Sequence, residues 1–130
     1  MSLNDPLASA LSLIFNAEKV GKKECIVKPS SKIIKLVFDI MKENQYLGEY
    51  KEVTDKRGNY LLVNLIGKIN RCGVIKPRFP VTVGEYEKFE KRFLPAKDFG
   101  ILIVSTSKGM MIHNKSKEKN LGGKLLAYCY

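Results

Sequence analysis

Residues 99–109, FGILIVSTSKG, place the strongest constraint on how this chain folds. The apolar run from Phe99 to Val104 is far shorter than the roughly 20 residues that span a bilayer, and it is typical of a buried strand. A polar segment follows at once, made of Ser105, Thr106, Ser107, Lys108 and Gly109. The chain must therefore leave a core strand through a turn, and Gly109 permits backbone conformations there that a β-carbon would forbid.

The N-terminal part of the chain shows two helical patterns. A helix is predicted from Pro6, which suits a first helical position, and it ends before Gly21. The apolar stripe within residues 33–41 predicts a second amphipathic helix, which Ser30 or Ser31 can cap. Both helices present one apolar face, so both require a sheet or another helix to cover them.

Short β-prone segments alternate with these helices. Residues 24–27 form one, and residues 46–53 and 60–66 predict a hairpin around a turn at 54–59. The order is α-β-α-β-β, which indicates a small sheet with both helices on one face. We expect this part to form an N-terminal subdomain over residues 1–67.

The composition changes after Gly67, where glycine and proline limit strand length within residues 70–81. The aromatic spacing of Tyr86, Phe89 and Phe93 predicts a short helix. The remaining segments predict a buried strand, a shorter strand, a Lys-rich helical turn and a closing strand, at residues 100–106, 110–113, 114–120 and 124–130. The sequence therefore predicts an α+β chain whose second subdomain, residues 68–130, is mostly antiparallel β with short helices.

Net charge indicates the class of partner. The chain carries 23 Lys+Arg against 13 Asp+Glu, which gives a formal charge of +10 and a pI near 9.6. Such a basic chain is expected to bind polyanions. The cations are spread along the whole sequence rather than gathered on one amphipathic helix, which favours nucleic acid over a membrane surface. Most are lysines, which contact phosphates as point charges, so tracking of the backbone is favoured over reading of base edges.

Several other classes of function lack their motifs. Cys25, Cys72 and Cys129 are far apart and His113 is the single histidine, so neither a disulfide framework nor a zinc site is expected. No nucleotide-binding loop or paired catalytic carboxylates occur, and we expect no cofactor, metal, catalytic residue or small-molecule substrate. An enzyme would have to rely on His113 and Ser105, and His113 is expected at a strand end or on the surface. The N-terminus lacks a basic signal region, which favours a cytoplasmic protein.

The segment 105–109 has two interpretations. Short hydroxyl side chains next to a glycine can contact an RNA backbone and unstacked base edges. The same residues can instead form local hydrogen bonds that close a turn, and residue types alone favour this second interpretation.

Three further segments are candidate RNA contacts. Residues 28–32 (Lys28, Pro29, Ser30, Ser31 and Lys32) surround a predicted helix start, where N–H groups and hydroxyls suit a phosphate and also suit plain capping. Lys76 and Arg78 lie on a predicted edge strand. Gly122 and Gly123 permit close backbone approach, or they end the preceding helix in a left-handed cap.

Taken in order along the chain, these motifs resemble the small-subunit ribosomal protein eight family. The segments that carry the resemblance are NDPLASAL, PSSK, STSKG, LGG and LLAYCY, and together they cover essentially the whole chain. The segments CGVIKPRFPV and EYEKFEKRFLP are similar to the archaeal and eukaryotic branch of that family, so we expect the archaeal type.

The resemblance implies a primary binder of small-subunit ribosomal RNA that acts in the cytoplasm among neighbouring ribosomal proteins. Members bind an irregular helix in the central domain of that RNA and support assembly of the particle. By position, the resemblance assigns specific contacts to Ser105, Thr106, Ser107, Lys108 and Gly109, backbone contacts to Pro29, Ser30, Ser31 and Lys32, and a further contact to Gly122 and Gly123. The chain departs from many relatives by carrying Lys124, where they have glutamate. A non-ribosomal RNA-binding regulator, including one that represses its own messenger RNA, is the alternative function.

Overall fold

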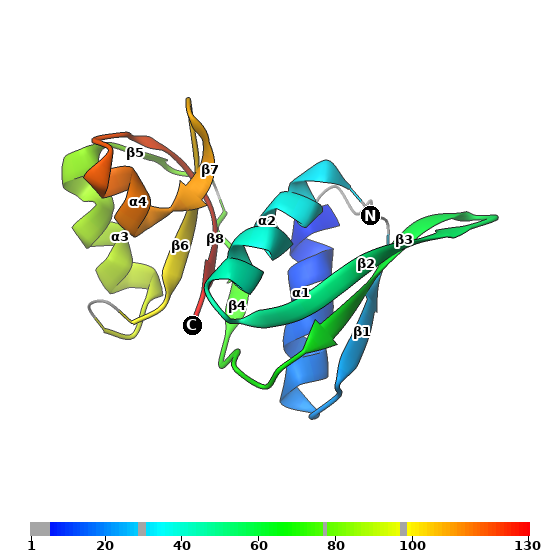
Figure 1. The fold of residues 1–130 in the computed structure, drawn as a ribbon. Helices are drawn as coiled ribbons and strands as arrows, with labels where there is room; N and C mark the ends of the chain where they lie inside the picture. The colour runs from blue at the N-terminus through cyan, green and yellow to red at the C-terminus, as the bar shows by residue number, and fades with distance from the viewer. Residues whose placement is uncertain (1–5, 29–30, 77, 97–98) are drawn as a thin grey trace. The chain divides into compact units, whose positions relative to one another are not determined.

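The computed structural model describes residues 6–28, 31–76, 78–96 and 99–130. The chain divides into two compact units, residues 1–72 and 73–130. The boundary expected from the sequence, after residue 67, lies a few residues earlier, in the segment that follows β3. Each unit has its own sheet and its own buried core, and each is described by itself below (Figure 1).

Two helices cover one face of the first unit, as the apolar spacing predicts. Helix α1 spans Pro6–Lys19 and α2 spans Lys32–Glu43. Ser31 is the N-cap of α2, and its hydroxyl accepts a hydrogen bond from the backbone N–H of Ile34 at 3.3 Å. Their apolar stripes are buried together with the inward side chains of the sheet. The main core residues are Leu11, Ile14, Val37, Phe38 and Met41 from the helices and Val27, Leu61 and Val63 from the strands.

The sheet of the first unit is antiparallel with the order β1-β3-β2. Its strands are β1 Glu24–Val27, β2 Leu47–Asp55 and β3 Gly58–Leu65. The hairpin between β2 and β3 turns on two residues, Lys56 and Arg57, whereas the sequence predicts a six-residue turn. Gly58 has a φ of 123°, a conformation that glycine adopts readily, and pairing therefore continues to the tip of the hairpin.

The second unit is built on a five-stranded sheet with the order β4-β8-β6-β7, in which β5 also pairs with β8. Its strands are β4 Cys72–Val74, β5 Pro80–Val81, β6 Ile101–Thr106, β7 Gly109–Ile112 and β8 Gly123–Cys129. Its helical segments are the 3-10 turn η1 Val83–Glu85 and the helices α3 Tyr86–Phe93 and α4 His113–Glu118. The α+β class with two antiparallel sheets is confirmed.

Helix α3 packs on one face of this sheet. Tyr86 and Phe89 are buried against Leu102 and Val104 of β6 and Leu125 of β8. Since side chains alternate across a strand, Ser105 faces away from this core. The predicted burial is confirmed for the four residues from Ile101 to Val104. It is wrong for Phe99, the first residue of the predicted run, which is exposed and lies before β6.

Candidate nucleic-acid interface

The segment 105–109 forms a tight hairpin turn between β6 and β7. Thr106 pairs with Gly109, so Ser107 and Lys108 alone make the turn. The Thr106 hydroxyl donates a hydrogen bond to the carbonyl of Gly109 at 2.7 Å and accepts one from the N–H of Lys108 at 3.1 Å. Gly109 has a φ of 111°, which a side chain would disfavour. Thr106 therefore closes the turn through local hydrogen bonds, as the second of the two interpretations has it.

The other two hydroxyls are available to a partner. Ser105 and Ser107 are exposed, and within the described part of the chain neither hydroxyl has a hydrogen-bond partner. The turn thus presents two polar groups on a backbone that the sheet and Thr106 hold in place. Ser105 is especially well held, because β6 lies between β7 and β8.

Strand β8 brings the glycine pair to this turn. Gly123 pairs with Thr106, and Lys124 pairs with Ser105. A β-carbon on Gly123 would overlap the Ser105 carbonyl oxygen, and one on Gly122 would lie 2.6 Å from the carbonyl oxygen of Val81. These glycines therefore serve, first of all, to let neighbouring strands pack closely against one another.

The alternative role of the glycine pair, a left-handed helix cap, is wrong. The residue that follows α4 in the left-handed region is Asn120, with a φ of 55°. Asparagine tolerates this conformation because its short amide can bond locally. Gly122 and Gly123 come later, where the chain enters β8.

Strand β5 adds a third segment on the other side of β8. Pro80 pairs with Lys124 and Val81 with Gly123. Arg78 and Lys76 are exposed, and they lie in the segment between β4 and β5, so their predicted position on an edge strand is wrong. The structure therefore brings together residues 78–81, 105–109 and 122–124 at one end of the sheet.

The predicted phosphate site at residues 28–32 lies in the first unit. Pro29 and Ser30 lie outside the described residues. Lys28 is exposed, with its ammonium 5.2 Å from the centroid of the Tyr60 ring, and Lys32 is the exposed first residue of α2. The Ser31 hydroxyl caps the helix, so the capping role is confirmed. Phosphate contact there stays a prediction.

Three groups from different elements meet inside the second unit. His113 directly follows the end of β7, which is one of the two places expected for it, and its side chain is buried rather than on the surface. Its Nδ1 accepts a hydrogen bond from the N–H of Leu102 at 3.1 Å, and its Nε2 lies 3.1 Å from a carboxylate oxygen of Glu90. Lys117, which belongs to the predicted Lys-rich helical turn, pairs with the same oxygen. This cluster joins α3, α4 and β6.

The three cysteines are free thiols, as expected. Burial, together with the nearby Glu18 carboxylate, raises the pKa of Cys72 to about 12. Burial also raises the pKa of Cys25, against a smaller opposing effect of Lys22. Neither of these two environments favours the thiolate. In the described ranges, His, Cys, Asp and Glu side chains form no group of three or more that could hold a metal ion.

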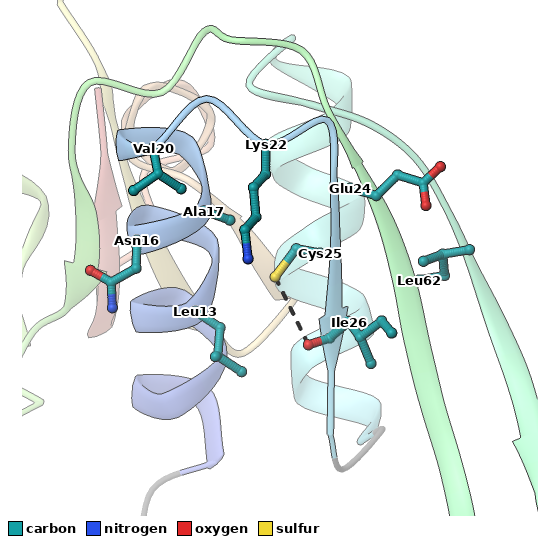
Figure 2. Close-up of a pocket in the computed structure, with 9 residues that line it drawn as sticks. All are labelled: Leu13, Asn16, Ala17, Val20, Lys22, Glu24, Cys25, Ile26 and Leu62. Carbon is teal, nitrogen blue, oxygen red and sulfur yellow. Dashed lines mark hydrogen bonds between the residues drawn. The ribbon is translucent and has the colours of Figure 1, made fainter.

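A groove of about 570 Å³ lies in the first unit, between α1 and the edge strand β1 (Figure 2). Leu13, Val20 and Ile26 line it and are largely exposed. Figure 2 shows the Cys25 thiol directed at the carbonyl of Ile26, a contact of 3.9 Å. This lining is mainly apolar and offers few polar groups that could orient a ligand.

Lys124 stands at the start of the predicted closing strand and is noted from the sequence only as a departure from relatives, so it is not among the predicted contacts. The signal that could have found it is the pattern GKLLAYC, in which one cation stands in an otherwise apolar strand. Such a residue marks the solvent face of the strand. Only the pairing of β8 with β6 shows that Lys124 and Ser105 lie on the same face of the sheet.

Comparison with known proteins identifies the family of this chain. A family model described as Ribosomal protein S8 matches residues 5–130, nearly the whole chain. No helix in the described ranges is long and apolar enough to cross a membrane. The family consists of structural ribosomal proteins rather than enzymes, and its members bind small-subunit ribosomal RNA and neighbouring ribosomal proteins in the cytoplasm. The chain belongs to the ribosomal protein S8 family and is a ribosomal RNA-binding protein of the small subunit.

Proposed function

We propose that this protein binds an irregular helix in the central domain of small-subunit ribosomal RNA and thereby supports assembly of the subunit. The observation that carries the proposal is the pair of exposed hydroxyls on Ser105 and Ser107, which project from a hairpin whose own turn is closed by Thr106. A rigid backbone with uncommitted hydroxyls loses little conformational entropy when it meets RNA.

The physical reason for an irregular target lies in RNA geometry. A regular A-form duplex has a narrow major groove that side chains cannot read, whereas irregular positions expose base edges and 2′-hydroxyls. Short hydroxyls can donate and accept at such positions. Lys76, Lys108 and Arg78 are exposed in the same unit and add sequence-independent attraction to phosphates.

The first unit contributes backbone contacts in this proposal. Lys28 and Lys32 are exposed on either side of the Ser31 cap, close to the N-terminus of α2. The positive end of a helix dipole favours an anion there. We assign this segment to affinity rather than to specificity.

The test replaces the two exposed serines and keeps Thr106, because Thr106 closes the turn. Two lost hydrogen bonds of about 0.5–1.5 kcal/mol each predict that the double variant Ser105→Ala, Ser107→Ala binds the irregular stem about tenfold more weakly. Binding to a regular duplex should not change. Affinities are measured by filter binding or calorimetry with both RNAs at one salt concentration.

Ser12→Ala is the matched control, since Ser12 is exposed on α1 and lies outside every proposed contact. It should bind both RNAs as the unmodified protein does. Unchanged affinity of the double variant for the irregular stem would contradict the proposal. A footprint of the protein on the full small-subunit RNA then locates the helix that is bound.

A further inference from the structure

Strand β1 is an edge strand of the first unit's sheet, and no strand pairs with its outer side. The N–H of Leu65 donates to the carbonyl of Lys23 at 2.8 Å, so these two residues form a hydrogen-bonded pair. Such pairs alternate along an antiparallel ladder, so every second residue of β1 bonds to β3. The backbone N–H and C=O groups of Glu24 and Ile26 therefore point to the open edge. Among the described residues, their one hydrogen bond there is the weak contact of the Cys25 thiol with the Ile26 carbonyl.

The groove beside β1 gives this edge an apolar border on both faces of the sheet (Figure 2). Leu13 and Val20 of α1 line it on the face that the helices cover, and they are 42% and 69% exposed. Val27 is buried in the core beneath the helices, so its neighbour Ile26, which is 53% exposed, points to the open face. The side chains of an extended segment alternate between the two faces. A segment paired with β1 would therefore cover both borders at once.

The charges around β1 select the kind of segment that fits. Lys22 and Lys23 precede the strand and Lys28 follows it, and Lys22 also lines the groove. None of the three has an ion-pair partner among the residues that the structure describes. Lysines beside an edge strand repel another cationic strand, and a second copy of this chain would bring its own lysines and a formal charge of +10. The same lysines attract carboxylates, so the edge is complementary to an acidic segment.

We propose that β1 accepts an extended, acidic segment of a neighbouring protein of the small subunit as a fourth strand of the sheet. The backbone of the segment bonds to Glu24 and Ile26. One of its apolar side chains enters the groove beside Leu13, and one of its carboxylates pairs with Lys22. Strand addition of this kind draws affinity from main-chain hydrogen bonds and specificity from pockets for alternate side chains. The inference does not depend on the proposed function, because it concerns the first unit and a protein partner.

Hydrogen exchange tests the backbone contacts directly. The full-length protein is compared free, bound to small-subunit ribosomal RNA alone, and assembled into small subunits, with exchange resolved to single residues by mass spectrometry. The amides of Glu24 and Ile26 should exchange about tenfold more slowly or less in the subunit, and with RNA alone as fast as in the free protein. Added protection at alternate residues identifies a paired strand, because the amides between them already bond to β3.

Matched substitutions test the groove and the edge. Leu13→Gln and Leu36→Gln change helical leucines that are 42% and 41% exposed, and of the two only Leu13 lines the groove. In competition with the unmodified protein during reconstitution of subunits, Leu13→Gln should be incorporated about threefold less and Leu36→Gln equally well. Ile26→Pro should be incorporated about fivefold less than Ile26→Ala, because only proline lacks the outward N–H, and an edge strand tolerates proline at such a position.

Unchanged exchange at Glu24 and Ile26 in the subunit, or protection by RNA alone, would overturn the inference, and so would equal incorporation of Leu13→Gln and Leu36→Gln. A benzophenone amino acid in place of Val20 identifies the occupant in assembled subunits. A cross-link to an acidic segment of a neighbouring protein supports the inference, and one to RNA or to a second copy contradicts it. Binding of Leu13→Gln to the irregular stem should be unchanged, so failure here leaves the proposed function standing. Thermal unfolding shows that each variant is folded, and the exchange experiment needs no variant.

Discussion

A small buried polar cluster determines how α4 is anchored. The N–H of Leu102 donates to Nδ1 of His113, so the proton of the neutral ring is on Nε2, where it faces the Glu90 carboxylate. Lys117 pairs with that carboxylate as well, and it is partly exposed, which screens its contribution. His113 is thus a structural residue, with both ring nitrogens engaged inside the protein.

We predict that His113→Ala destabilises the protein by about 2–4 kcal/mol, because it leaves a buried N–H and a largely buried carboxylate without their partner and opens a cavity. Urea unfolding followed by circular dichroism measures this change. Lys115→Ala, on the exposed side of the same helix, should stay within about 0.5 kcal/mol of the unmodified protein. A loss below about 1 kcal/mol for His113→Ala would mean that the cluster does not stabilise the fold.

At the scale of elements, β8 is the strand on which the candidate interface depends. It pairs with β4, β5 and β6, and it reaches the turn at Ser105 only because its first residue has no side chain. The pairing of β6 with β8 also shifts register after Ile103, where β8 contains one extra residue, Leu126. Bulges of this kind reorient side chains locally.

Gly123→Ala should therefore cost both stability and RNA affinity. The new methyl group meets the backbone of Ser105, which cannot move without displacing β6, so we expect a loss of about 2 kcal/mol or more and weaker binding to the irregular stem. The matched control is Gly84→Ala, because a β-carbon at Gly84 meets no atom within 4 Å and its φ is not in the left-handed region. Thermal unfolding and RNA affinity that match this control would refute the steric role.

For the whole molecule, charge and architecture act on different properties. The net charge of +10 favours any polyanion, and this attraction weakens as salt rises. Discrimination between RNAs requires groups in a defined geometry, and the proposed function assigns this role to the exposed hydroxyls on the sheet of the second unit. Affinity and specificity should therefore respond to different substitutions.

The double variant Lys28→Gln, Lys32→Gln tests this separation. It should lower the salt slope by about 1.4–1.8, the effect of two lost phosphate contacts, and keep the ratio of affinities for the irregular stem and a regular duplex. Lys22→Gln with Lys23→Gln removes the same charge from the same unit and should leave the slope nearly unchanged. A changed ratio would show that residues 28–32 contribute to specificity.

The elements that follow from local patterns could be predicted from the sequence. The stripe that includes Val37 and Phe38 predicts α2, and a cap at Ser30 or Ser31 predicts where it begins. The run before Ser105 predicts a buried strand. Hydrophobic periodicity and capping depend on neighbours three or four residues away, so the sequence contains them directly. The positive φ of Gly109 is another feature that the local sequence indicates.

The neighbours of each site residue depended on contacts between distant segments. Lys124 lies beside Ser105 because β8 pairs with β6, and His113 is buried because Glu90 and Leu102 come from other elements. The role of Thr106 was open for a related reason, since its residue type suits a turn bond and an RNA contact equally. Residue types and their spacing thus determined the helices, the core strand and the attraction to polyanions. Strand register and burial, which join residues far apart in the chain, decided which groups are exposed beside one another and which support the fold.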